Sequence, residues 1–253
     1  MEGWGFWTAA VIASVCVGMG KGGLPVVAML SVPVLSLYIS PVAAAGLLLP
    51  IYVVSDMFGL WAYRRDFDGR VIIIVCAGAT VGVALGWATA SVVPERAVTA
   101  LVGAIGAVFA VMYLLRRKGT AERRRAKVGP GLFWGGLAGF TSFVSHGGGP
   151  PYQVYTLPLG MPKAVFAGTT TITFAYVNAI KLLPYWALGQ LGSANLHVAA
   201  WLAVPSALAV FLGVRLVRVL PEALFFKLVT WALLAVSLRL LWQAAVSPAV
   251  SGG

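Results

Sequence analysis

The sequence predicts an all-α integral membrane protein built from an inverted-topology internal repeat, and three observations lead to this fold class. The chain of 253 residues is 60% hydrophobic and only 10% charged, with a mean hydropathy of +0.92, whereas soluble domains carry roughly 25% charged residues. Runs free of charge, such as 71–93 and 97–115, are long enough for the roughly 20 apolar residues of a membrane helix. A glycine-rich motif occurs twice, and the basic loops place its two copies in opposite orientations.

The repeated motif is a glycine cluster followed by a proline. Residues 20–25 read Gly-Lys-Gly-Gly-Leu-Pro, and residues 145–150 read Ser-His-Gly-Gly-Gly-Pro. The similarity extends over a whole segment, which indicates an internal duplication. With a slip of three positions, further residues match: Gly46 with Gly168, Asp56 with Asn178, and Tyr63 with Tyr185.

The first half, 1–115, is predicted to contain a hairpin and three membrane helices. The apolar stretch 4–38 is too long for one ordinary crossing, and the glycine motif divides it into two arms of about fifteen residues each. Each arm reaches about 22 Å, short of the roughly 30 Å hydrocarbon thickness. This length favours a re-entrant hairpin with a glycine tip over two full crossings. Helices are expected after it at 41–63, 71–91 and 95–115.

The second half, 131–253, repeats this plan after a basic linker at 116–130. A hairpin is expected over 131–161, with the second glycine cluster at its tip. The helices expected after it are 162–188, 195–217 and 221–245.

Loop charges predict the orientation. Basic residues concentrate in 64–70, in 215–222 and in 116–127, which alone holds 7 of the 18 basic residues. Such loops belong on the cytoplasmic side, whereas 93–96 and 189–197 carry little net charge and belong outside. Equivalent loops then lie on opposite sides, so the duplication is inverted. Each half crosses the bilayer an odd number of times, as a hairpin with three helices or as five crossings. Both termini are expected outside a multi-pass inner or plasma membrane protein.

Inverted repeats built around broken helices are a transporter architecture, with the substrate held at the repeat interface. Each tip proline can open a helix whose N-terminus, with unpaired amides and a positive dipole end, offers an anion site. The alternative is that glycine and proline only permit close packing and a kink. The candidate substrate-binding residues at the tips are Gly20, Lys21, Gly22 and Gly23, and His146, Gly147, Gly148 and Gly149.

Lys21 and His146 occupy matching positions of the two tips. A charge at the bilayer centre costs roughly 2.5–3.5 kcal/mol on insertion scales, so such residues are functional candidates. Lys21 could supply counter-charge, and His146 could gain or lose a proton; snorkelling and a hydrogen-bonded core histidine are the alternatives. His146 and Asp56 are the candidate coupling residues, although Asp56 could instead pair with Arg64 or Arg65.

Further polar residues of the second half could address a ligand. Asn178 and Lys181 are three positions apart and share a helix face. Tyr152 and Gln153 follow the second tip and could donate hydrogen bonds to an oxyanion, with aromatic packing as the alternative. The threonines within 169–173 could line a pore or bond back to helical carbonyls.

The sequence carries no enzyme signature such as Gly-x-Ser-x-Gly, His-Glu-x-x-His or a Walker loop. We therefore expect no catalysis, no cofactor and no metal; Cys16 and Cys76 fall inside apolar runs without metal-ligand spacing. The net charge of +11 comes from loops and does not require a nucleic acid partner. The expected partners are a small oxyanion, the lipid bilayer and anionic lipids near the basic linker, and a homo-oligomer stays open.

Three glycine-rich segments also carry a family resemblance. They are residues 18–25 with Val32-Pro33 downstream, residues 147–150 with Leu157-Pro158 downstream, and the Gly-Thr-Thr-Thr stretch at 168–171. Together, over about residues 5–245, they resemble the TauE/SafE sulfite exporter family, also known as the toluene-sulfonate uptake permease group. The resemblance implies a secondary transporter of sulfite, organosulfonates or related oxyanions, most often by export. Lys21 and His146 depart from the usual pattern. Proton-coupled uptake, and a membrane-embedded enzyme or partner subunit, are the alternatives.

Overall fold

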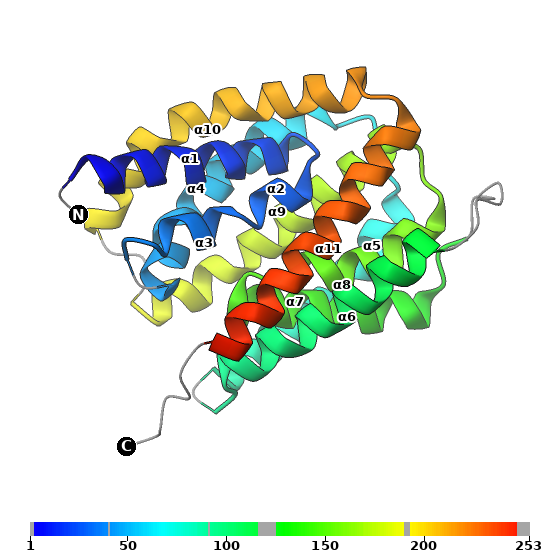
Figure 1. Cartoon of the computed structure of the whole chain (residues 1–253), viewed down its shortest axis with the longest axis horizontal. Coiled ribbons are helices and arrows are strands. Elements are labelled where there is room, and N and C mark those ends of the chain that lie inside the picture. The colour runs from blue at the N-terminus through cyan, green and yellow to red at the C-terminus, as the bar shows by residue number, and fades with distance from the viewer. Residues whose placement is uncertain (1–2, 40, 91, 116–124, 190–192, 247–253) are drawn as a thin grey trace.

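A computed structural model describes residues 3–39, 41–90, 92–115, 125–189 and 193–246, and it is all-helical over these residues (Figure 1). The prediction of an all-α protein is therefore confirmed. In chain order, the elements are α1 (Trp4–Lys21), α2 (Pro25–Ala28), α3 (Ser31–Leu35), α4 (Pro41–Ala62), α5 (Gly69–Ala88), α6 (Glu95–Leu115), α7 (Val128–Ser145), α8 (Gly149–Thr156), the 3₁₀ turn η1 (Leu157–Leu159), α9 (Lys163–Ala187), α10 (Ser193–Val219) and α11 (Glu222–Val246).

Five helices of the described residues are long and apolar enough to cross a membrane: α4, α5, α6, α10 and α11. Large apolar side chains stand exposed on them, among them Trp201 and Leu101, as expected where lipid is the solvent. α9 is as long, but it buries several threonines, an asparagine and a lysine, which marks it as an interior helix. The chain is a multi-pass membrane protein.

Both glycine clusters interrupt the helical path. α1 ends at Lys21 and α7 ends at Ser145, and a short helix follows each break. The first return arm, predicted as one arm to residue 38, is divided into α2 and α3, because Pro33 has no N–H to donate to the carbonyl of Met29. The second hairpin begins earlier than the predicted residue 131, since Pro130 fits the first turn of α7, where a missing donor costs little.

Helices of one half pack against helices of the other. α1 contacts α10 and α7 contacts α5, while α4 contacts α9 and α6 contacts α11. Glycines allow the backbones to approach: a Cβ added at Gly82 of α5 would lie 1.9 Å from the carbonyl oxygen of Gly136 on α7. Small residues at crossings are the usual means of close helix packing in membranes.

Replacing Gly82 with alanine is therefore expected to destabilise the protein by about 1 to 3 kcal/mol, because the new methyl must push α5 and α7 apart. Gly129→Ala is the matched control, since a Cβ at that α7 position meets nothing within 4 Å. Thermal unfolding of the purified protein in detergent measures both. Equal melting temperatures for Gly82→Ala and the control would contradict the packing described above.

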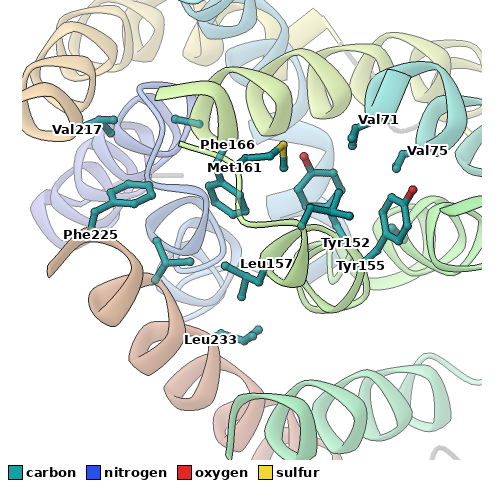
Figure 2. Packing of buried hydrophobic residues seen from close by; sticks show 14 of the residues in the cluster. Val71, Val75, Tyr152, Tyr155, Leu157, Met161, Phe166, Val217, Phe225 and Leu233 are labelled. Carbon is teal, nitrogen blue, oxygen red and sulfur yellow. The ribbon is translucent and has the colours of Figure 1, made fainter. Parts of the chain in front are cut away.

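The largest buried hydrophobic cluster joins the second break to the surrounding helices (Figure 2). Tyr152 and Tyr155 of α8 lie in this cluster with Val71 and Val75 of α5. On its other flank, the ring of Phe166 meets Phe225 of α11 at 6.1 Å between centroids. This packing holds α8 and η1 in place against α5, α9 and α11.

Candidate functional site

A cavity of about 60 Å³ lies between the two chain breaks, α4 and α9. It is polar on several sides, because hydroxyl, amide and amino groups reach it from α4, α7 and α9. Among the residues proposed from the sequence, those that line it are Gly20, Lys21, His146, Gly149, Asn178 and Lys181. The cavity thus brings together charged side chains of both halves.

Lys21 and Asp56 form a buried ion pair beside this cavity. Lys21 Nζ lies 2.6 Å from Asp56 Oδ1, and each residue is only 4% exposed. Asn178 Nδ2 donates to the other carboxylate oxygen at 2.8 Å. The sequence left open a pairing of Asp56 with Arg64 or Arg65; the structure pairs it with Lys21.

Lys181 is buried without such a partner. It is 1% exposed, and its Nζ donates to the carbonyl and the hydroxyl oxygen of Ser142 at 3.3 and 3.2 Å. No described carboxylate forms an ion pair with it. Its ammonium also lies 6.0 Å from the centre of the Tyr185 ring. An amine without a carboxylate partner therefore borders the cavity, with neutral oxygen ligands only.

His146 sits at the second break in a left-handed backbone conformation, with φ 53°. This conformation ends α7, since left-handed residues are common helix caps. Its Nδ1 lies 3.4 Å from the Tyr185 hydroxyl, whereas Nε2 is buried without a hydrogen bond from the described protein atoms. Nε2 is thus the ring nitrogen that lacks a partner among the described residues.

The breaks supply fewer free amides than the sequence indicated. At the first break, the N–H groups of Gly22, Gly23 and Leu24 donate to α1 carbonyls at 2.8, 3.1 and 3.2 Å. At the second, Pro150 and Pro151 have no N–H at the start of α8. The side-chain cations, rather than paired helix N-termini, are therefore the main source of positive charge at the cavity.

Two tyrosines donate hydrogen bonds to the backbone beside the breaks. The Tyr63 hydroxyl donates to the carbonyl of Gly22 at 2.6 Å, and the Tyr185 hydroxyl donates to the carbonyl of Phe143 at 3.3 Å. Gly22 and Gly23 lie next to Lys21 in the chain but do not line the cavity. Gly23, with φ 104°, provides the turn itself.

The remaining proposed residues lie behind the cavity. Tyr152 and Gln153 are buried in the packing of α8, as the aromatic-packing alternative had it for Tyr152. Gly148 packs against α7, where a Cβ would lie 2.6 Å from the Ala138 carbonyl oxygen. Gly147 borders a second cavity, described below. None of these four lines the first cavity.

Tyr52 is a cavity residue that sequence reasoning missed. Lys21 Nζ lies 5.2 Å from the centre of its ring, and its hydroxyl bonds Ser31 Oγ at 2.7 Å and donates to the Ala28 carbonyl at 3.0 Å. Its position four residues before Asp56 on one helix was the available signal, since such residues share a face. Thr171 was noticed, and its hydroxyl donates to the Lys21 carbonyl at 3.1 Å.

The donor set suits an anion better than a metal ion. Within the described residues, no three His, Cys, Asp or Glu side chains come together. The groups that face the cavity are ammonium, amide, hydroxyl and imidazole, which can donate hydrogen bonds to an oxyanion.

Comparison with known proteins gives a family match over nearly the whole chain. The family model described as Sulfite exporter TauE/SafE matches residues 6–240. Neither the curated proteins nor the solved structures gave a match. The matched residues include both chain breaks and every side chain that lines the cavity.

Proposed function

Because the chain belongs to the TauE/SafE sulfite exporter family, a family of membrane transporters, we propose that it exports a small oxyanion, sulfite in the first place, through the cavity between its two breaks. Lys21, Lys181, Asn178 and His146 are the proposed substrate ligands. The protein needs no catalytic step for this function.

One observation carries the proposal: the charges around the cavity do not cancel. Two buried lysines, Lys21 and Lys181, face a single aspartate, Asp56. A buried amine without a counter-charge is costly to protonate, and a bound anion stabilises its charged form. A bound monoanion would neutralise the site, and Lys181, whose ligands are all neutral, is the natural contact.

The size of the cavity favours sulfite over organosulfonates. A volume of about 60 Å³ corresponds to roughly four water molecules at about 15 Å³ each. Sulfite has the same number of non-hydrogen atoms, whereas an aromatic sulfonate has more than twice as many. In the present conformation, the cavity therefore suits the small inorganic anion.

The arrangement of helices supports the proposed inverted repeat. Suppose that α1, α4, α5 and α6 correspond to α7, α9, α10 and α11. The most extensive contacts between helices then have counterparts: α1 with α10 matches α7 with α5, and α4 with α10 matches α9 with α5. The return arms α2–α3 and α8 are too short to span roughly 30 Å, which favours re-entrant hairpins. We place the basic loops in the cytoplasm and both termini outside.

Membrane potential would drive export without a coupled ion. A monoanion that leaves a negative interior gains about 2.3 kcal/mol per 100 mV. Uptake would require coupled protons or sodium, with His146 or Asp56 as the candidate carrier. Asp56 is held by Lys21 and Asn178, so His146, with its open Nε2, is the better candidate of the two.

Flux in proteoliposomes tests the function. Vesicles loaded with sulfite should release it when the protein is present and a potassium gradient with valinomycin sets an inside-negative potential, and the rate should fall when the potential is reversed. Sulfate, thiosulfate, small carboxylates and an aromatic sulfonate are compared at equal concentration. Absence of flux for every anion would refute the proposal, and flux that follows only an imposed pH gradient would favour coupled uptake.

His146→Asn separates a role of the imidazole from its backbone role. Asparagine tolerates the left-handed conformation found at this residue, so the fold should be kept, whereas the imidazole ring that lines the cavity is lost. We expect about a tenfold lower sulfite flux, because the variant loses about the free energy of one hydrogen bond to a charged ligand. The melting temperature should be unchanged. Flux equal to that of the unaltered protein would remove His146 from the site.

A further inference from the structure

A second cavity, of about 80 Å³, adjoins the first. The two share Tyr52, His146, Met29 and Ala28 as common walls. The second cavity extends away from Lys21 toward α6 and α11, which supply residues to it and none to the first. The wall between the cavities is thus one tyrosine, one histidine and the chain at the end of α2.

Arg239 and Gln243 of α11 line this second cavity. They are four residues apart and share one helix face. Arg239 makes no ion pair with any carboxylate of the described residues, and no acidic residue lines the cavity. An unpaired guanidinium offers a planar set of donors that matches an oxyanion, and the Gln243 amide can add another.

Two residues that line the second cavity each hold a polar atom without a partner. Ser36 Oγ and His146 Nε2 belong to residues that line the second cavity, and both atoms are buried without a hydrogen bond from the described protein atoms. Buried polar atoms normally have partners. Together with Arg239, the Ser36 hydroxyl forms a set of donors from α3 and α11 that lacks an acceptor.

We propose that the second cavity is an anion subsite, held by Arg239 and Gln243, that takes the same oxyanion at the outer end of the transport path. The inference rests on the proposed function, because the subsite would be the place where the transported ion binds after it leaves the first cavity. α11 ends toward the side of the molecule where α1 begins (Figure 1), which is the side proposed to face outward. His146 borders both cavities and passes the anion from Lys181 to Arg239, while Tyr52 separates them.

Sulfite flux kinetics of Arg239 variants test the subsite. Arg239→Gln is expected to raise KM about tenfold with kcat within twofold, because a charge-assisted contact is lost outside the central cavity. Arg239→Lys should keep most of the affinity, and Gln243→Leu should raise KM about threefold. The matched control is Lys227→Gln, a cation on the same helix that is exposed, as Arg239 is, but lines neither cavity.

Three results would overturn the subsite. The first is an unchanged KM in Arg239→Gln while the unaltered protein transports sulfite, which leaves the proposed function intact. The second is a KM change that appears in vesicles with anionic lipid and vanishes in phosphatidylcholine vesicles, which would assign Arg239 to lipid headgroups. The third is absence of any anion flux in the unaltered protein, which refutes the proposed function and the subsite with it. Equal melting temperatures of Arg239→Gln and Lys227→Gln show that folding does not cause the effect.

Discussion

Lys181→Met is expected to abolish sulfite transport, with a loss of about 100-fold or more, while the protein stays folded. Lys181 is the buried cation whose ligands are all neutral, so its removal takes away the uncompensated charge that attracts the anion. A hydrogen bond to a charged group is worth about 1.5 to 3 kcal/mol, and the loss of charge adds to it. Methionine fills a similar volume without a desolvation cost, so thermal stability should hold or rise.

The combination of lost flux and retained stability distinguishes a functional lysine from a structural one. Flux is measured in proteoliposomes at equal protein incorporation, and melting temperature is measured in detergent with and without sulfite. Sulfite should raise the melting temperature of the unaltered protein and not that of Lys181→Met, since a ligand stabilises only the state that binds it. Lys227→Met is the control. Transport within threefold of the unaltered protein would show that Lys181 does not hold the anion.

Asp56→Asn is expected to destabilise the protein by about 3 to 5 kcal/mol, because it leaves Lys21 buried without its counter-charge. The side chain keeps its size and can still accept a hydrogen bond from Asn178. The loss of stability therefore measures the effect of removing the negative charge. Little folded protein should be recovered after solubilisation, as judged by size-exclusion chromatography and thermal unfolding. This variant has the largest structural effect among those considered.

The double variant Lys21→Met, Asp56→Asn should recover most of that stability. It removes both charges of the pair and keeps the single positive charge of Lys181, so the cavity charge is unchanged. A double-mutant cycle should give a coupling of about 2 kcal/mol or more. Additive effects of the two substitutions, or an Asp56→Asn variant as stable as the unaltered protein, would contradict the pairing.

The places where the helices break could be predicted from the sequence, and the pairings across the cavity could not. Glycine clusters beside proline mark helix ends because glycine and proline act locally on the backbone. The Lys21–Asp56 pair joins residues 35 positions apart on different helices, and local patterns carry no such distances. The sequence therefore suggested, as partners for Asp56, the arginines nearest to it in the chain, Arg64 and Arg65.

The backbone amides of the glycine clusters and Arg239 show two further limits of prediction from the sequence. A glycine cluster indicates exposed N–H groups, but whether they bond back to the preceding helix depends on how the chain turns, and at Gly22 and Gly23 they do. Arg239 lies in an otherwise apolar run, and a charge at such a position is a candidate site by itself. That signal was present in the sequence and was outweighed by the glycine motifs.

The way α1 lies on α10 and α7 lies on α5 constrains how such a carrier can change shape. A Cβ at Gly18 would lie 2.0 Å from the Ser206 carbonyl oxygen. At this crossing the backbones of α1 and α10 are therefore in direct contact, with no side chain between them. Each hairpin is thereby fastened to a helix of the opposite half. A motion that separates residues 1–115 from residues 125–246 would have to break these crossings, whereas one that moves α1 with α10 and α7 with α5 would keep them.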